Sequence, residues 1–136
     1  MARVRPLIAL CLCVPGLAAC GTSASTSGFK GVQHEVAQGI ADLQSDATSS
    51  NRENICKKDL SAAIVAKLGG RKGCEEALKH QLAQIDKLDT TIVSVKVAPG
   101  GKSATARVKS TYEGKTREKT VPLVKEGGRW KVSGAP

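Results

Sequence analysis

The stretch TTIVSVKVAPGGKSATARVKSTYEGKTREKTVPLVKEGGRWKV, residues 90–132, decides the fold class. Apolar and polar residues alternate along it, and glycines interrupt the alternation at 100–101, at 114 and at 127–128. A period of two is typical of half-buried strands, and glycines at these intervals are typical of turns between antiparallel strands. The sequence therefore predicts an antiparallel meander of four strands. Its expected inward residues are Val93, Val95, Val97, Ala104, Ala106, Val108, Val121, Leu123, Trp130 and Val132.

Three helices are predicted before the strands, from apolar residues spaced three and four apart. They cover 29–43, about 60–68 and about 74–88, with a polar break at 45–51 and a glycine stop at 69–70. The expected inward face of the first helix is Phe29, Val32, Val36, Ile40 and Leu43. That of the third is Cys74, Ala77, Leu78, Leu82, Ile85 and Leu88. Helices followed by a meander indicate the α+β class, with the helices packed on a curved sheet.

A resemblance to a known superfamily accompanies this order of elements. The ending Val121–Val132, in which a Gly-Gly-Arg-Trp-Lys-Val hairpin places Trp130 against the core, resembles the nuclear transport factor 2-like (cystatin-like α+β roll) superfamily. In particular, the chain resembles small actinobacterial lipoproteins of that fold. The likeness covers roughly residues 29–133 and implies a reduced version of the roll.

Enzymes of this superfamily use a carboxylate or histidine inside an apolar cone between helices and sheet, where burial moves its pKa toward neutrality. No acid stands among the expected inward strand residues, so we predict no catalytic site, no cofactor and no metal site. A small-molecule carrier or enzyme that uses this cone is the alternative. The candidates for such a role are His34, Asp42, Asp46, His80 and Tyr112.

The N-terminus has the features of a targeting segment. Arg3 and Arg5 precede an uncharged stretch of 14 residues, 6–19, which is too short to span a bilayer. It ends in Leu17-Ala18-Ala19-Cys20, which resembles the lipobox of bacterial lipoproteins and implies cleavage before Cys20 and acylation of its thiol. An ordinary secretory signal, or a buried free cysteine, is the alternative. We therefore expect a signal peptide at 1–19, a lipidated Cys20 with a flexible tether to residue 28, and one domain at 29–136. The expected location is the outer face of a bacterial cell membrane.

Cysteine usage is consistent with an oxidising compartment. Cys11 and Cys13 lie in the segment predicted to be removed, which leaves Cys56 and Cys74 besides Cys20. An even pair in an extracytoplasmic domain predicts one disulfide, Cys56–Cys74. Redox or metal chemistry is the weaker alternative, because no CxxC spacing is present.

Charge is distributed unevenly along the chain. The 21 Lys and Arg outnumber the 12 Asp and Glu, and residues 90–136 hold ten basic against three acidic residues. We predict a basic outer sheet face formed by Arg107, Lys109, Arg129 and Lys131 that attracts anionic lipid, wall polymer or an acidic protein. A solvated face without a partner is the alternative. Nucleic acid is not an expected partner, because three aromatic residues cannot line a base-stacking platform.

Overall fold

The computed structural model describes residues 24–83, 89–112 and 114–134 and shows an α+β domain. The helical elements are α1 (Gly31–Thr48), α2 (Arg52–Asn54), the π-helical turn η1 (Ile55–Asp59), α3 (Ala62–Lys67) and α4 (Gly70–Leu82). The strands are β1 (Asp89–Val97), β2 (Ser103–Tyr112), β3 (Lys115–Glu126) and β4 (Arg129–Val132). They form one antiparallel sheet in the order β1-β2-β3-β4, so the predicted meander is confirmed.

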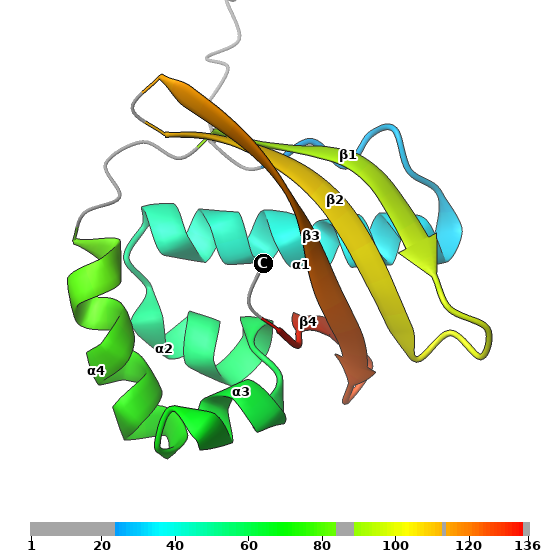
Figure 1. Ribbon diagram of the computed structural model, residues 1–136. Helices are drawn as coiled ribbons and strands as arrows, with labels where there is room; N and C mark the ends of the chain where they lie inside the picture. Colours follow the sequence, from blue (N-terminus) through cyan, green and yellow to red (C-terminus); the bar gives the residue numbers. More distant parts are fainter. Residues whose placement is uncertain (1–23, 84–88, 113, 135–136) are drawn as a thin grey trace, which may run out of the picture.

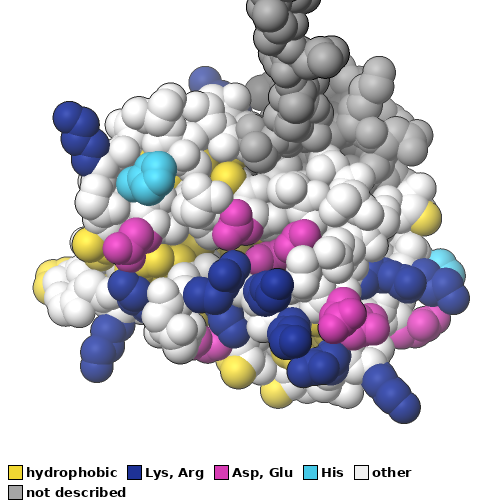
Figure 2. Space-filling view, turned by 180° about the vertical axis from the view of Figure 1, so that it is seen from behind, with side chains coloured by type: hydrophobic (Ala, Val, Ile, Leu, Met, Phe, Trp, Pro, Cys, Tyr) yellow, Lys and Arg dark blue, Asp and Glu magenta, His cyan; other side chains and the backbone are white. Residues whose placement is uncertain are grey.

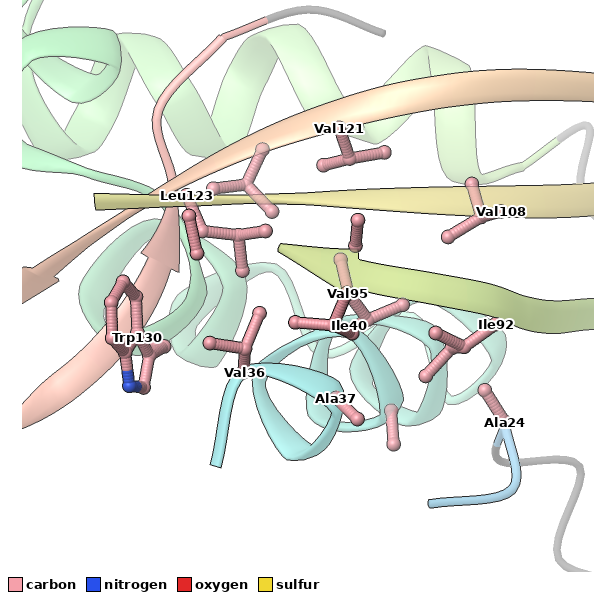
Figure 3. Close-up of a cluster of buried hydrophobic side chains, with 14 residues drawn as sticks. Ala24, Val36, Ala37, Ile40, Ile92, Val95, Val108, Val121, Leu123 and Trp130 are labelled. Carbon is pink, nitrogen blue, oxygen red and sulfur yellow. The ribbon is translucent and has the colours of Figure 1, made fainter. Parts of the chain in front are cut away.

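Helix α1 lies across one face of the curved sheet and closes the main core (Figure 1). Val36 and Ile40 from α1 meet Val95, Leu123 and other inward strand residues (Figure 3). The alanines expected to face inward on β2 are buried, and their small side chains leave room for the helix to approach. At Gly39 the approach is closest, because a Cβ atom there would lie 2.9 Å from the carbonyl oxygen of Trp130. The space between α1 and the sheet is thus packed with apolar side chains.

Two predicted inward residues are exposed. Strand β1 carries a bulge between Ile92 and Ser94, which turns Ile92 and Val95 inward and leaves Val93 40% exposed. A bulge adds one residue to the strand, so the simple alternation through Val93 was wrong. Val32 is also exposed, at 42%, because it lies in the first turn of α1, before the first buried residue of that helix, Val36.

The observed helix bounds differ from the predicted ones: α3 covers Ala62–Lys67, and the sequence did not predict α2 or η1. Helix α1 continues through Thr48 and so includes part of the polar break expected at 45–51. Hydroxyl groups in this stretch bond back to helical carbonyls; Thr48 Oγ1, for example, donates to the oxygen of Gln44 at 3.0 Å. Helix α4 begins at Gly70, directly after Gly69 with its positive φ of 88°, so the predicted start at Cys74 was four residues late. It ends at Leu82; Ile85 and Leu88 lie outside the described residues.

The elements from α2 to α4, residues 52–82, form a helical corner beside β4 (Figure 1). Leu60 pairs with Val132 in a parallel bridge, and the amide of Ser61 donates to the Val132 carbonyl at 2.8 Å. A second small cluster of Ala47, Ile55 and Leu82 packs inside this corner. The corner therefore covers the edge of the sheet that β4 would otherwise expose.

Candidate functional site: a basic hairpin arm

The β2–β3 hairpin extends beyond the main core. Among the β2 residues whose side chains the structure describes, Val108 is the last that is buried, and on β3 the first buried residue is Val121. Residues 115–120 are exposed on both faces of the sheet, and the hairpin end curves away from α1 (Figure 1). The described residues 109–112 and 114–119 are called the hairpin arm below.

The hairpin arm carries cations without matching anions. Lys115, Arg117 and Lys119 are exposed, and none forms an ion pair with a described residue. Lys109 lies opposite Glu118, whose pKa is lowered mainly by a hydrogen bond from Arg107 and also by the charge of Lys109. The Nε of Arg107 donates to Glu118 at 2.8 Å. Glu118 is thus already engaged, and the positive charge of the arm is left facing solvent.

The structure divides the predicted basic face into two parts. Arg107 and Lys109 lie on β2, whereas Arg129 and Lys131 lie on β4, and β3 runs between the two strands. The four side chains therefore do not lie side by side, and the crowding of like charge expected from that arrangement is absent from these strands. The register explains the separation, because β2 and β4 each pair with β3 and not with one another.

The basic residues near β4 have acidic partners. Arg129 reaches Asp42 of α1 at 3.4 Å, and Lys131 reaches Glu126 at 3.8 Å. Lys125 binds Glu35 at 3.0 Å, and the hydrogen bond and charge of this lysine lower the pKa of Glu35. Figure 2, which views the molecule from the α1 side, shows Lys and Arg side chains mixed with Asp and Glu across this face. Among the described residues, Arg129 and Lys131 of β4 are therefore paired with acids, whereas Lys115, Arg117 and Lys119 of the arm are not.

The chain enters the domain close to the base of the arm. Ala24 is buried in the main core and lies next to Ile92, at the end of the core that also holds Val108 and opposite the end that holds Trp130 (Figure 3). Ala24 thus packs in the core five residues before the expected start of the domain at Phe29. Ser25, Ser27 and Gly28, within the tether predicted for residues 20–28, are exposed. Cys20 itself lies outside the described residues.

Cys56 and Cys74 are joined by a disulfide that links η1 to α4. Their Cα atoms are 6.0 Å apart, a separation common for disulfides. Both cysteines are buried, and Cys74 has no exposed surface. The bridge ties the last long helix to the turn that contacts β4.

The residues considered for catalysis do not converge. His34 and His80 are exposed on different helices, and His34 Nδ1 lies 3.3 Å from the carbonyl oxygen of Thr26. Asp42 is occupied by Arg129, and Asp46 accepts from Asn54 Nδ2 at 3.4 Å. The Tyr112 side chain lies outside the described residues. Within the described ranges no three His, Cys, Asp or Glu side chains form a group suited to a metal ion.

Asp59 is a buried acid that the sequence did not reveal. It ends η1 with 3% of its surface exposed, and burial together with the neighbouring Asp46 carboxylate raises its pKa to about 7. Its Oδ2 has no hydrogen-bond partner among the described atoms. A lone acid between two lysines and a leucine carries no sequence signal of burial, because the π-helical turn that directs it inward is set by tertiary contacts.

No protein-family model matches the chain, and no curated protein matches it. No helix in the part of the chain that the structure describes combines the length and apolar character needed to cross a bilayer.

Proposed function

We propose that the protein is an extracytoplasmic, non-catalytic binding module, anchored through a lipid on Cys20, whose hairpin arm binds anionic lipid head groups. The observation that carries this proposal is the position of Ala24 beside Ile92, at the same end of the core as Val108 and the base of the cationic arm. The predicted anchor and the unpaired cations of the arm thus belong to the same end of the domain.

Two lengths support this assignment. Four residue steps separate Cys20 from Ala24, and an extended chain covers about 14 Å over that distance. The arm runs four residues beyond Val108 to Tyr112, which is about 13 Å of strand. A domain held this close to its anchor therefore keeps the end of the arm within reach of the membrane surface.

The strength of the interaction is modest and depends on tethering. Each basic residue close to an anionic membrane contributes about 1 kcal/mol, so Lys115, Arg117 and Lys119 contribute about 3 kcal/mol together. An interaction of that strength holds a free domain at the membrane only weakly. A tether raises the effective concentration of the membrane surface, so that a weak contact is enough to orient an anchored domain.

We also propose that the domain is a reduced nuclear transport factor 2-like roll. What supports this is the order of elements, with helices before a curved four-stranded meander, and the burial of Trp130 against α1. The interior between α1 and the sheet favours the binding module over the alternative of an enzyme that works inside the cone, because the cluster that fills it is apolar and the buried acid Asp59 lies in η1, outside that cluster.

The arm is tested with a chain that begins at residue 20 and carries Cys20→Ser, mixed with phosphatidylglycerol vesicles and with neutral vesicles. We expect binding to the anionic vesicles that falls with salt, because surface attraction is screened within about 10 Å at 0.1 M salt. The triple variant K115Q/R117Q/K119Q should bind about a hundredfold more weakly. The matched variant K30Q/K58Q/K72Q removes the same charge from exposed positions outside the arm and should retain most of the binding.

Equal losses in the two triple variants would contradict a specific role of the arm. Binding that does not change with salt would contradict the electrostatic mechanism. If an anionic wall polymer or an acidic protein binds through the arm while vesicles do not, the partner class proposed here is wrong although the surface is correct.

The anchor is tested by intact mass measurement of the protein extracted from membranes. We expect the chain to begin at Cys20 and to carry the mass of a diacylglyceryl group with or without a further acyl chain. An unmodified Cys20, or a leader still attached to it, would contradict the anchoring.

A further inference from the structure

A second surface, unrelated to the hairpin arm, is an apolar groove in the helical corner. It has a volume of about 500 Å³ and lies between the C-terminal half of α1, helices α3 and α4, and the end of β4. Its walls are mainly aliphatic, with Leu43, Ile55, Ile64, Leu68, Leu78 and Leu82 among them. Leu68 is 37% exposed, so apolar surface is left facing water. We infer that this groove binds one long acyl chain of a fatty acid.

The volume fits one chain. An apolar protein cavity of about 150 Å³ accommodates a benzene molecule, so 500 Å³ accommodates on the order of twenty carbon atoms. That is the size of a single long chain and not of the two chains of a diacyl lipid. It also lies within the range of about 300–1,000 Å³ that is usual for small-molecule sites.

The charge at the groove selects a negative head group. Among the described residues that line the groove, Lys67 is the one that is ionisable. It is exposed and forms no ion pair with the described residues. An exposed ammonium at the rim of an apolar groove complements a ligand with an apolar tail and one carboxylate.

The backbone around the groove disfavours a peptide as the occupant. The edge of β4 that borders the groove is already used, because the Val132 carbonyl accepts from the Ser61 amide at 2.8 Å. A bound peptide strand could not use this occupied edge to add a strand to the sheet, and its own amides would lose water without gaining new hydrogen-bond partners. An acyl chain has no such groups to satisfy. The disulfide between η1 and α4 holds two walls of the groove together.

The inference is tested by titrating laurate, and separately dodecanol, into the Cys20→Ser chain that begins at residue 20. Displacement of an environment-sensitive fluorescent fatty acid gives the Kd. We expect saturable binding of one laurate per chain. Leu68→Gln should weaken it about tenfold, since contacts with one to two methylene groups are lost. Val32→Gln, a matched change at an exposed apolar residue of α1 outside the groove, should leave the Kd unchanged.

Two further variants separate the roles of tail and head group. Lys67→Gln should raise the Kd for laurate about two- to fivefold, the range of an exposed ion pair, and leave that for dodecanol unchanged. Gln81→Leu extends the apolar wall and should tighten both ligands, which tests the groove even if Leu68→Gln proves unstable.

Three outcomes would overturn the inference. These are absence of saturable binding by a chain with a cooperative thermal unfolding transition, equal losses in Leu68→Gln and Val32→Gln, and tighter binding of a cationic amphiphile than of laurate. The triple variant of the hairpin arm should retain laurate binding. A failure of the inferred acyl-chain binding by the groove can therefore be distinguished from a failure of the proposed membrane binding by the arm.

Discussion

The β4 end of the domain and the hairpin arm differ in how they use the same type of residue. At the β4 end, Lys125 and Arg129 reach Glu35 and Asp42 of α1. On the arm, exposed lysines and arginines have no such anions among the described residues. The difference arises because β4 lies against α1, which supplies acids, whereas the arm curves away from that helix (Figure 1). Net charge along a sequence therefore does not show where free charge is displayed.

The same comparison applies to packing. The β4 end is bordered by α1 and the helical corner, and it holds the buried Asp59, the disulfide and the close approach at Gly39. Beyond Val108 on β2, none of the arm residues whose burial the structure describes (109–111 and 114–119) is buried. We expect the β4 end to determine stability and the arm to determine binding, and substitutions at the two ends should separate these properties.

The largest expected effect comes from Asp59. Its pKa is about 7 in the folded protein and 3.8 in the unfolded chain, so the folded state holds the proton more tightly. The stabilisation is complete below about pH 4 and is lost as pH rises through 7. Between pH 5 and pH 8 the free energy of unfolding should fall by on the order of 2 to 4 kcal/mol. Chemical denaturation at both pH values measures this change.

Asp59→Asn should remove most of that pH dependence and be more stable than the wild type at pH 8, because the amide mimics the protonated acid. Asp89→Asn, at an exposed position at the start of β1, is the matched control and should keep the dependence. A wild-type protein equally stable at both pH values would contradict the assignment.

Loss of the disulfide should have the next largest effect. The closed loop spans 18 residues, and its removal in C56A/C74A should lower the free energy of unfolding by about 3 kcal/mol. Denaturant unfolding with and without reductant provides the measurement. Two free thiols in the purified protein, detected by alkylation and mass spectrometry, would rule out the bridge.

Two glycine substitutions compare the ends directly. Gly39→Ala forces a Cβ against the backbone oxygen of Trp130 and should cost about 2 kcal/mol in spite of the better helix propensity of alanine. Gly114→Ala, at the tip of the hairpin, meets no atom within 4 Å and is opposed only by its φ of 74°, at a cost of about 1 kcal/mol. Thermal unfolding of both variants should preserve this order, and the reverse order would contradict tight packing at β4.

The smallest effect on stability is expected from single arginines. Arg129→Gln removes an exposed ion pair with Asp42 and should lower stability by about 0.5 kcal/mol. Arg117→Gln should leave stability unchanged and weaken vesicle binding about fivefold. Measuring both properties in both variants sharpens the comparison, since equal binding losses would mean that the two ends display equivalent charge.

The sequence predicted the α+β class, the four strands and most inward residues of β2, β3 and β4, because periodicity and glycine turns are local signals. It was wrong at Val93, where a bulge altered the register, and at the start of α4, where two glycines in left-handed conformations produced the turn. It also grouped Arg107, Lys109, Arg129 and Lys131 on one face, because residue alternation indicates the face of a sheet but does not show that β3 lies between β2 and β4.

Taken by itself, the amino-acid sequence determined the order of helices and strands, the alternation that selects core residues, and the excess of positive charge after residue 90. Only the tertiary structure decided which cations are neutralised, where Ala24 enters the core, how Asp59 is buried and where an apolar groove opens. The physical reason is the separation along the chain between the residues that interact. Secondary structure follows from neighbours a few residues apart, whereas ion pairing, desolvation and cavities depend on groups that meet across 60 to 90 residues of chain, as Glu126 meets Ala62 and Lys125 meets Glu35.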